Sequence, residues 1–350
     1  MRHQPLALAA AIVLGASLVA CKEAPPPPEV EQAPRYELAT VMGNLSAPRG
    51  LAIGPDGFLL STTEGLTALG PEGQLRVIAP VGQTIKGPAG LALAAGSTFL
   101  ADPPTNRIYR MLEDGALEAF AGTGTALFPI GDGGLAISAQ LDAPFDVKAD
   151  AKGALFIADT GHHRIRRVDT DGRITTVAGN GLARFEGDGG AAKDAALHAP
   201  VALNVGADGS LYVADTGNHA IRRIAPDGAI STVAGNGVEG FAGDGGPAAS
   251  SQLASPSGVV VLPGGDLLVS DTGNHRIRWI RPGGAIWTVA GNGKGGHSDE
   301  ADDARRASID APEAIALAPD GSPFFVDTKA GRLYQLRGEK PATPSVSPSP

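Results

Sequence analysis

A four-residue turn motif recurs along this chain at a constant interval of 56 residues. Ala-Asp-Thr-Gly at 158–161 returns at 214–217, and Ser-Asp-Thr-Gly follows at 270–273. A period of this length is typical of repeat proteins, in which each unit buries its apolar face only against its neighbours. Five prolines keep the interval and a sixth lies 40 residues before the first of them: Pro88, Pro144, Pro200, Pro256 and Pro312, with Pro48 ahead of them. The sequence therefore predicts six repeats, of which the first is short.

Each full repeat contains four short runs of β-branched and aromatic residues. In the fourth repeat these runs are 201–205, 210–214, 220–225 and 229–235, with Gly or Pro in the turns between them. Such residues favour strands, while Pro and Gly supply the fixed or positive φ that tight turns need. Four-stranded units repeated around an axis are the blades of a β-propeller, whereas the coils of a stacked β-helix are much shorter. We therefore predict an all-β fold: a six-bladed β-propeller of four-stranded blades.

Composition agrees with this fold. The chain of 350 residues contains 49 glycines and 28 prolines, which interrupt it too often for a helical bundle or a coiled coil. Hydrophobic residues make up 43% and charged residues 19%, so the chain has enough apolar material to fold. A single core stops growing near about 250–300 residues, so a chain of this length divides into domains or repeats one unit.

Closure of the ring is also visible in the sequence. The sixth repeat runs into the C-terminal tail without a fourth strand. Upstream of the first repeat, YELATVMGN at 36–44 aligns with AISTVAGN at 229–236, which is a fourth-strand sequence. We therefore expect the N-terminal strand to complete the last blade and to remove two strand edges that would otherwise be open. The propeller is predicted to cover residues 36–337.

The repeats resemble a known family. The pattern DxxGxLYVADTGNHRIRRVxxDGxITTVAGNG is similar to NHL-repeat propellers, including bacterial and teneurin-type versions with AGNG and GFAGDGG loops. The resemblance extends over residues 36–337; it is specific in repeats three to five and weakest in repeat one. It implies a six-bladed fold and, for most members, a role as a binding platform. Some relatives are metal-assisted lyases or lactonases.

The N-terminus resembles that of a bacterial lipoprotein. Arg2 and His3 precede an apolar run at 6–20, which is shorter than the roughly 20 residues that span a bilayer. The run ends in Leu-Val-Ala-Cys, which resembles a lipobox and implies acylation of Cys21. No other cysteine exists, so Cys21 cannot form a disulfide within the chain. The alternative is a cleaved signal with an incidental cysteine.

These features predict the remaining organisation. Residues 1–20 are a lipoprotein signal peptide, and 21–35 are the lipidated cysteine and a Pro-rich tether. Residues 338–350 are a disordered Pro/Ser-rich tail. The protein is thus expected to be exported and anchored by its lipid, palmitate included, to a membrane of the cell envelope. The outer membrane is favoured over the inner, because Lys22 follows the cysteine.

Charge and motifs restrict the function classes. The formal net charge of −9 argues against nucleic acid, whose binding relies on neutralising phosphates. The sequence contains no GxSxG, HExxH or GxxxxGK[ST] motif, so it assigns no catalytic residue. Two hypotheses follow. One is a binding platform for a protein, peptide or glycan; the alternative is a metal-assisted lyase or lactonase with its site at the mouth of the central channel.

The candidate binding face follows from strand direction. In an up-and-down blade, the connections to the next blade and the turns between the second and third strands lie at the same end. The aromatic residues there flank a notch in the rim at repeat one or fix their loops to the blades, and the histidines are architectural or metal-ligating. The predicted face comprises His163, Arg164, His219, His275, Arg276, Phe128, Phe185 and Phe241.

Other recurring polar residues receive structural interpretations. The turn aspartates are expected to accept bonds from the backbone N–H groups just after them. The GDGG aspartates are single carboxylates within glycine-rich loops, whereas calcium needs six or more oxygen ligands. The arginines of the RIRR strands are expected to be solvated, as on a sheet with one wet side. The two aspartate sets are Asp102, Asp159, Asp215, Asp271 and Asp327 in the turns, and Asp132, Asp188 and Asp244 in the loops.

Repeats five and one depart from the pattern. Repeat five replaces GFAGDGG by the charged segment 296–310. It is a candidate site for a divalent cation or a basic partner, and the alternative is a solvated acidic loop with local salt bridges. No other cofactor is expected. Repeat one has a shorter connection, which predicts a notch in the rim. The candidate cation ligands are His297, Asp299, Glu300, Asp302 and Asp303.

Overall fold

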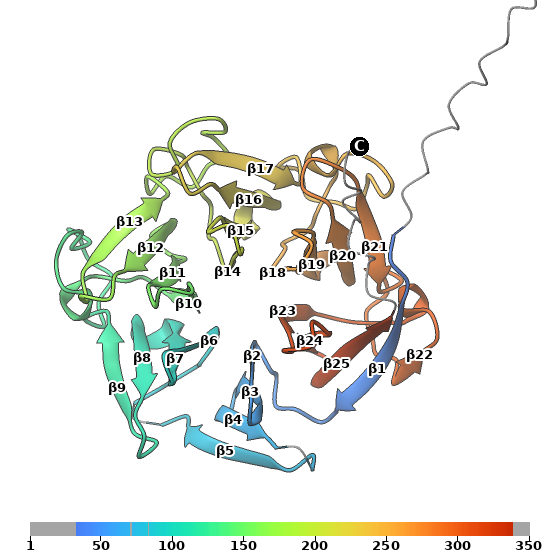
Figure 1. The fold of residues 1–350 in the computed structure, drawn as a ribbon, viewed down its shortest axis with the longest axis horizontal. Coiled ribbons are helices and arrows are strands. Elements are labelled where there is room, and N and C mark those ends of the chain that lie inside the picture. The colour runs from blue at the N-terminus through green and yellow to red at the C-terminus, as the bar shows by residue number, and fades with distance from the viewer. Residues whose placement is uncertain (1–32, 71, 83, 339–350) are drawn as a thin grey trace, which may run out of the picture. The chain divides into compact units, whose positions relative to one another are not determined.

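The computed structural model describes residues 33–70, 72–82 and 84–338, which form six β-sheets arranged in a ring (Figure 1). This confirms the predicted six-bladed propeller. The first three blades are β2 (Gly50–Gly54), β3 (Gly57–Thr62), β4 (Gly65–Leu69) and β5 (Leu75–Pro80); β6 (Leu91–Ala94), β7 (Ser97–Asp102), β8 (Arg107–Met111) and β9 (Leu117–Ala121); and β10 (Pro144–Ala149), β11 (Leu155–Asp159), β12 (Arg164–Val168) and β13 (Ile174–Ala178).

The other three blades repeat this order, with the first strand of each nearest the axis (Figure 1). Blades four and five are β14 (Ala202–Val205), β15 (Leu211–Asp215), β16 (Ala220–Ile224) and β17 (Ile230–Ala234), then β18 (Gly258–Val261), β19 (Leu267–Asp271), β20 (Arg276–Ile280) and β21 (Ile286–Ala290). Blade six contains β23 (Pro312–Leu317), β24 (Pro323–Asp327) and β25 (Arg332–Gly338), with β1 (Tyr36–Met42) and β22 (Glu300–Ala301) outside them. The described residues contain no α-helix, only short 3-10 turns such as Ala248–Ser250.

The hydrophobic core lies between blades. One buried cluster joins Phe99 and Ile108 of blade two to Val147 and Ile157 of blade three. Every residue of the second strand in blades three to six is buried, because both faces of that strand are covered by neighbouring blades. Burial of a large apolar side chain contributes about 1.5–3 kcal/mol, so the ring is stabilised mainly by contacts between successive blades.

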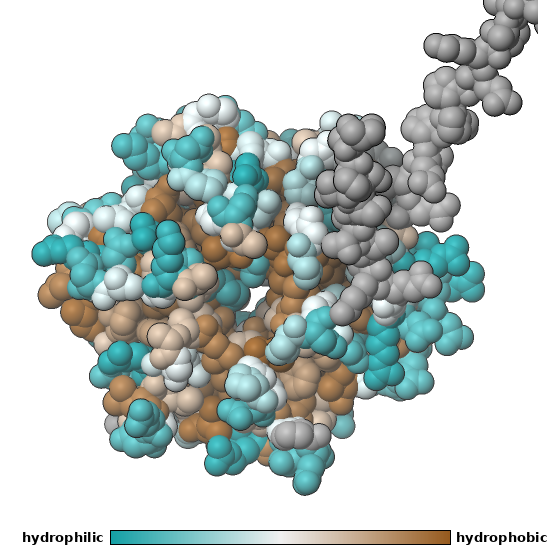
Figure 2. All heavy atoms as spheres, in the orientation of Figure 1, coloured by the Kyte–Doolittle hydropathy of each residue, from teal (hydrophilic) through white to brown (hydrophobic). Residues whose placement is uncertain are grey.

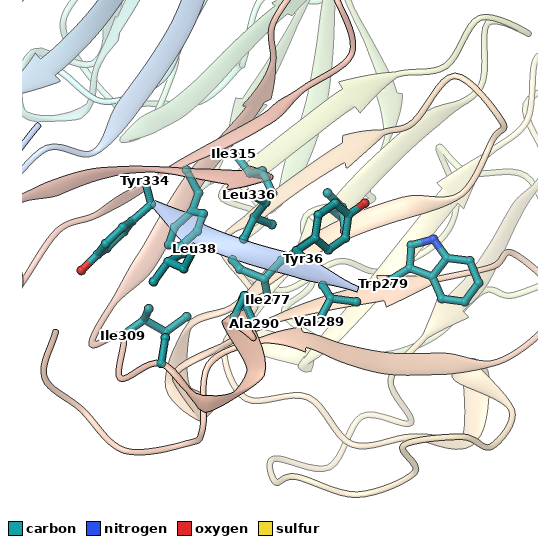
Figure 3. Packing of buried hydrophobic residues seen from close by; sticks show 14 of the residues in the cluster. Tyr36, Leu38, Ile277, Trp279, Val289, Ala290, Ile309, Ile315, Tyr334 and Leu336 are labelled. Atoms are coloured by element: carbon teal, nitrogen blue, oxygen red, sulfur yellow. The ribbon is translucent and has the colours of Figure 1, made fainter. Parts of the chain in front are cut away.

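The N-terminal strand closes the ring, as predicted. β1 pairs antiparallel with β25, with Leu38 opposite Leu336. Tyr36 and Leu38 enter a buried cluster with Trp279 of blade five (Figure 3). The sequence did not predict β22, which pairs Glu300 with Ala39 and gives this blade a fifth strand.

The propeller has two unlike faces. We call the face that carries the second-to-third-strand turns and the connections between blades the loop face, and the opposite one the turn face. The connections are residues 43–49, 81–90, 122–143, 179–201, 235–257 and 291–311. The first two are the shortest, and a notch in the rim beside blade one stays a prediction. Tyr36 pairs with Gly338 on the turn-face side, so the described chain enters and leaves the ring there.

Three predictions cannot be examined in this structure. The signal peptide, Cys21 and nearly all of the tether precede the described residues. The Pro/Ser-rich tail follows them except for its first predicted residue, Gly338, which instead ends β25. Among the described residues, no helix has the length and apolar character needed to cross a membrane.

Candidate functional site

The recurring turn motif connects each blade to the next on the loop face. Thr160 of blade three donates its hydroxyl proton to the carbonyl of Pro200, which begins blade four, at 2.7 Å. The same bond recurs from Thr216 to Pro256 at 2.7 Å. Both of these periodic prolines therefore contribute their carbonyl to a bond between blades. The series continues with Thr272 to Pro312 and Thr328 to Pro48.

The turn aspartates bind a different group from the one expected. Asp159 accepts from the N–H of Asp142 at 2.8 Å, and Asp215 from that of His198 at 2.7 Å. These N–H groups lie before the first strand of the same blade, so the prediction of bonds to the following residues was wrong for this pair. The reason is the topology of the blade. The segment that leads into the first strand lies at the same end of the blade as the turn between the second and third strands. Each turn aspartate also accepts from a group three residues after it. For Asp327 this group is the backbone N–H of Ala330, and for the other four it is a side chain, such as that of Asn218 for Asp215 at 2.8 Å.

The recurring histidines hold neighbouring blades together. Nδ1 of His163 accepts from the N–H of Ala199 at 3.1 Å, and Nδ1 of His219 accepts from that of Ser255 at 3.0 Å. Because a backbone N–H can only donate, the ring proton of each neutral histidine is on Nε2. A metal ligand needs a free lone pair, so these two imidazoles cannot ligate through Nε2 while the bonds between blades persist.

His275 has the opposite arrangement. Its Nδ1 contacts the carbonyl oxygen of Asp310, which can only accept, so Nδ1 donates and the lone pair of the neutral ring lies on Nε2. The Asp310 carboxylate lies 3.6 Å from the same nitrogen. Burial and the neighbouring His198 lower the pKa of His163. The three recurring histidines therefore occupy separate blade junctions and do not share one electrostatic environment.

The central arginines of the third strands are buried, which contradicts the prediction that they are solvated. Arg222 is 1% exposed; its Nη1 lies 3.2 Å from Asp215 and its Nη2 lies 2.7 Å from Asp188. The prediction assumed that one face of the sheet is exposed to solvent, whereas both faces of this strand are covered inside a propeller. Arg223, the next residue, points the other way and is partly exposed. Arg166 and Arg278 make the same pair of contacts.

These contacts explain the GDGG loops. Asp188 belongs to the connection from blade three, yet it binds Arg222 of blade four, so it fixes the long loop to the next blade. Blades two and six have Tyr109 and Tyr334 at the arginine position, and the connections that enter them lack GDGG. The sequence analysis missed this pair, although the coincidence of arginine and GDGG within the same repeats is a signal that could have identified it.

The aromatic residues of the loops also contact arginine. Phe185 lies under the guanidinium of Arg222 at 5.0 Å, and Phe241 lies 3.6 Å from that of Arg276. These distances suit cation–π contacts, which supports the interpretation that the rings fix their loops. Phe128 differs: its ring lies 5.2 Å from that of His162, and the side chain is 72% exposed.

The same three connections expose apolar side chains. Monomeric proteins seldom leave several large apolar groups exposed on neighbouring loops without a binding role. We call the following set the apolar loop surface: Leu127, Phe128, Leu135 and Ile137 after blade two, Leu182 and Phe185 after blade three, and Val238 and Phe241 after blade four. The long loops thus present apolar groups on a scaffold that is fixed by hydrogen bonds and ion pairs.

The axis contains charged residues that the sequence analysis missed. Asp146 and Lys148 form an ion pair of 2.6 Å beside a cavity of about 30 Å³ that Arg49 and Glu313 also line. Asp146 also accepts from the N–H of Leu203 in the next blade at 3.1 Å. Burial raises the pKa of Asp146 despite the neighbouring ammonium group. A cavity of this size holds about two water molecules.

A departure from the repeat could have revealed this pair. The positions two and four residues after the periodic proline are Gly90 and Ala92 in blade two and Gly258 and Val260 in blade five. Only blade three has two charges there. A space-filling view shows hydrophobic residues gathered around the axis and hydrophilic residues toward much of the margin (Figure 2).

The acidic loop of repeat five is not assembled into one site. Asp299 forms an ion pair with Arg332 at 2.6 Å, and Asp303 forms one with Arg305 at 2.6 Å. Its backbone also holds the closing strand, since Thr40 donates its N–H to the carbonyl of Asp299 at 2.9 Å. The side chains of His297, Glu300 and Asp302 are exposed. Over the described ranges, no three His, Cys, Asp or Glu side chains are grouped so that they could hold a metal ion.

The turn face carries two open grooves. One, of about 1380 Å³, runs past the turns of blades three, four and five. The other, of about 1270 Å³, runs past blades four, five and six and is lined by Tyr36 and Gly338 at the ends of the propeller. Neither contains a residue that the sequence analysis selected.

Fold, repeat and loop geometry together define a six-bladed NHL-type propeller. The sequence profile of the teneurin NHL domain matches residues 37–186 and 179–236, and that of the NHL repeat matches 253–280. The chain therefore belongs to the teneurin NHL domain family. Teneurin-1 of Homo sapiens is 28% identical over 347 residues, covering 83% of this chain, and Teneurin-m of Drosophila melanogaster is 26% identical over 344 residues, covering 87%. The chain spans 12% of the length of each of these relatives.

Solved structures share the fold. An auxiliary nutrient binding protein from Bacteroides thetaiotaomicron superposes with a TM-score of 0.65 at 16% identity, covering 88% of this chain and 78% of that one. Virginiamycin B lyase from Staphylococcus aureus gives a TM-score of 0.54 at 15% identity, covering 86% and 99%. A gluconolactonase from Xanthomonas campestris gives 0.60 at 17%, covering 87% and 90%. These similarities establish the fold and leave the chemistry to the residues of this chain.

Proposed function

We propose that this protein is an exported, lipid-tethered binding platform that recognises a protein or peptide ligand on its loop face. The observation that carries the proposal is the apolar loop surface, which lies on three successive connections fixed to the following blades. The structural neighbours described as nutrient-binding proteins support a binding role for the fold. A glycan is less suitable, because sugar rings stack on exposed aromatic faces and two of the three loop phenylalanines are already stacked on arginines.

The tether has a consequence for orientation. Lipidation at Cys21, which the sequence predicts, would attach the propeller to the membrane through the strand that begins at Tyr36 on the turn-face side. An extended Pro-rich tether spans about 3.1 Å per residue, so roughly 45 Å is available between Cys21 and Tyr36. The loop face then lies at the end of the ring opposite to the attachment point, where a ligand outside the membrane can reach it.

Pull-down from envelope extracts, with the purified mature domain as bait, tests this function. A Leu127→Ser, Phe128→Ser, Val238→Ser variant should lose the captured protein, because the substitutions remove exposed apolar area without touching the blade core. Lys152→Ser, an exposed substitution on the turn face, is the matched control and should retain it. Equal capture by both variants would contradict the proposal.

The second candidate function is a metal-assisted lyase or lactonase at the loop-face mouth of the channel. One observation favours it: His275 alone among the recurring histidines has its Nε2 lone pair free. Elemental analysis of the purified domain before and after chelation distinguishes the two functions. Stoichiometric metal that is lost with His275→Ala would favour the enzyme, whereas a metal-free domain whose melting ignores chelator would favour the platform.

A further inference from the structure

The GDGG loops protect the outer edges of three blades. In blade four, the N–H of Gly189 donates to the carbonyl of Ile230 at 2.8 Å, and the N–H of Ile230 donates to the carbonyl of Gly190 at 3.0 Å. The connection thus pairs with the outermost strand like a short additional strand. Blades three and five have the same pair of bonds at Ile174 and Ile286, and in blade six β22 covers β1.

Blade one lacks this protection. Its outermost strand is β5, in which Leu75 occupies the position of Ile230. Leu75 is 42% exposed and Val77 is 39% exposed, whereas Ile230 is 1% exposed. The connection that enters blade one, 43–49, is too short to reach this edge. Across residues 33–70, 72–82 and 84–338, no loop backbone bonds to Leu75 or Val77.

Alternate residues of β5 direct their backbone N–H and C=O groups away from β4, toward the open edge of the blade. The N–H of Gly70 donates to the carbonyl of Gln74 at 3.0 Å, which makes these two residues a hydrogen-bonded pair at the hairpin end. In an antiparallel ladder such pairs alternate, so Arg76 bonds with Ala68 of β4. The N–H and C=O groups of Leu75 and Val77 therefore point away from the sheet. Unpaired edges of this kind are templates for an added strand.

The neighbouring outer strand is a poorer edge. In β9 of blade two, Leu117 is only partly exposed, and the ion pair of Glu118 with Arg110 places charge on the strand. Phe120 packs on Phe99 with ring centroids 5.0 Å apart. Side chains that are already ion-paired or packed inward are less available to an added strand. β5 presents two exposed apolar side chains on the same side of the strand instead.

We propose that β5 is a docking edge for an extended segment of a partner protein, which adds as a fifth strand to blade one. The segment is apolar at alternate positions, to meet Leu75 and Val77, and carries an acidic side chain opposite Arg76. Main-chain bonds supply affinity in this mode and alternate side chains supply specificity. This surface lies on the rim and does not depend on the ligand proposed for the loop face.

Charge argues against the other occupants. A second copy that paired β5 antiparallel through Leu75 and Val77 would place Arg76 opposite Arg76, and directly opposed like charges destabilise a sheet. The sequences 22–35 and 339–350 of this chain are rich in proline, which cannot donate to a strand ladder. Arg76 is exposed and has no ion pair among the described side chains, so it is available to an acidic residue.

Fluorescence polarisation with synthetic peptides tests the docking edge on the purified mature protein. The probe is a labelled nonapeptide of alternating Val and Thr with Glu at the centre, and the matched peptides carry Lys or Pro there. We expect the Glu peptide to bind up to about five-fold more tightly than the Lys peptide, and Arg76→Glu to reverse this order. The Pro peptide should not bind. Ser231→Glu on the covered strand β17 is the control and should leave the order unchanged.

Two further measurements make the outcome decisive. Val77→Pro removes an outward N–H that β4 does not use, so it should abolish peptide binding while the protein stays folded. Hydrogen exchange at Leu75 and Val77 should be fast in the free protein and slowed by the Glu peptide, without change at Ile230. Peptides that all bind alike, or exchange at Leu75 that is slow without peptide, would overturn the proposal. So would concentration-dependent dimerisation in sedimentation that Val77→Pro abolishes, because the occupant would then be a second copy.

Discussion

Asp188, in the loop between blades three and four, meets the side chain of Arg222 in blade four at 2.7 Å. The carboxylate comes from the connection that leaves blade three, and the buried guanidinium comes from the third strand of blade four. Asp215 completes the group from the other side at 3.2 Å. Because this arrangement recurs at Arg166 and Arg278, three long loops are held to the ring by buried charge.

Removing Arg222 should therefore destabilise the protein strongly. Arg222→Ala leaves Asp215 buried without its cation, and breaking a buried pair in this way costs about 3–5 kcal/mol. Asp188→Ala leaves the Asp215 pair intact and should cost less, about 1–3 kcal/mol. Urea denaturation monitored by circular dichroism measures both. Equal losses would contradict the prediction, because they would mean that the pair of Arg222 with Asp215 adds nothing to stability.

The histidine bonds between blades can be tested with a substitution that the chain itself supplies. Asn106 of blade two occupies the position of His219, with φ of 53° and 50°, and its side chain accepts from the N–H of Ala143 at 2.8 Å. His219→Asn should therefore stay within about 0.5 kcal/mol of the original free energy of unfolding. His219→Ala should lose about 1–3 kcal/mol, because the N–H of Ser255 loses its acceptor. Thermal melts of the two variants decide the matter, and a stable His219→Ala protein would argue against the bond.

Ring closure predicts a strong effect of a single residue in β1. Leu38 is 2% exposed at the junction of blades five and six, so Leu38→Ala should lower the free energy of unfolding by about 2–5 kcal/mol. Glu37 is exposed on the same strand, and Glu37→Ala should change it by less than about 0.5 kcal/mol. Denaturant titration gives both values. A Leu38→Ala protein as stable as its Glu37→Ala control would mean that β1 contributes little to closure.

Burial raises the pKa of Glu313 at the channel mouth above its ordinary value of 4.5, although Arg49 opposes the shift. The native state then binds more protons than the unfolded state between these two values, so Glu313 lowers stability as the pH rises through that window. The free energy of unfolding of Glu313→Gln, compared with that of the original protein, should accordingly increase from about pH 4.5 upward. The increase should stop once the pH exceeds the pKa of Glu313 in the folded protein. Urea melts across pH 4–8 measure this difference, with Glu72→Gln as an exposed control. A difference that is constant with pH would contradict the assignment.

Membrane attachment depends on one residue if the lipoprotein interpretation holds. Cys21→Ser should move the protein from the membrane fraction to the soluble fraction and abolish palmitate labelling, because the acyl chains supply the anchor. The propeller should fold as before, since Cys21 precedes its first strand. Cell fractionation with labelled palmitate is the measurement. Unchanged labelling or unchanged membrane fractionation of the variant would contradict the lipoprotein interpretation.

The period of the sequence was sufficient to determine the architecture, because strand and turn propensities act locally and repeat in register. The alignment of 36–44 with the fourth-strand pattern likewise identified the strand that closes the ring, for the same local reason. The tertiary structure decided which side chains face one another. The sequence pattern of the strand that contains Arg222 predicts one face exposed to solvent. The neighbouring blade and Asp188, a loop residue 34 positions earlier, nevertheless enclose Arg222. The exposure of Leu75, compared with the burial of Ile230, depends on whether a loop from the preceding blade reaches the edge. Both outcomes depend on contacts between blades, which a local pattern does not encode.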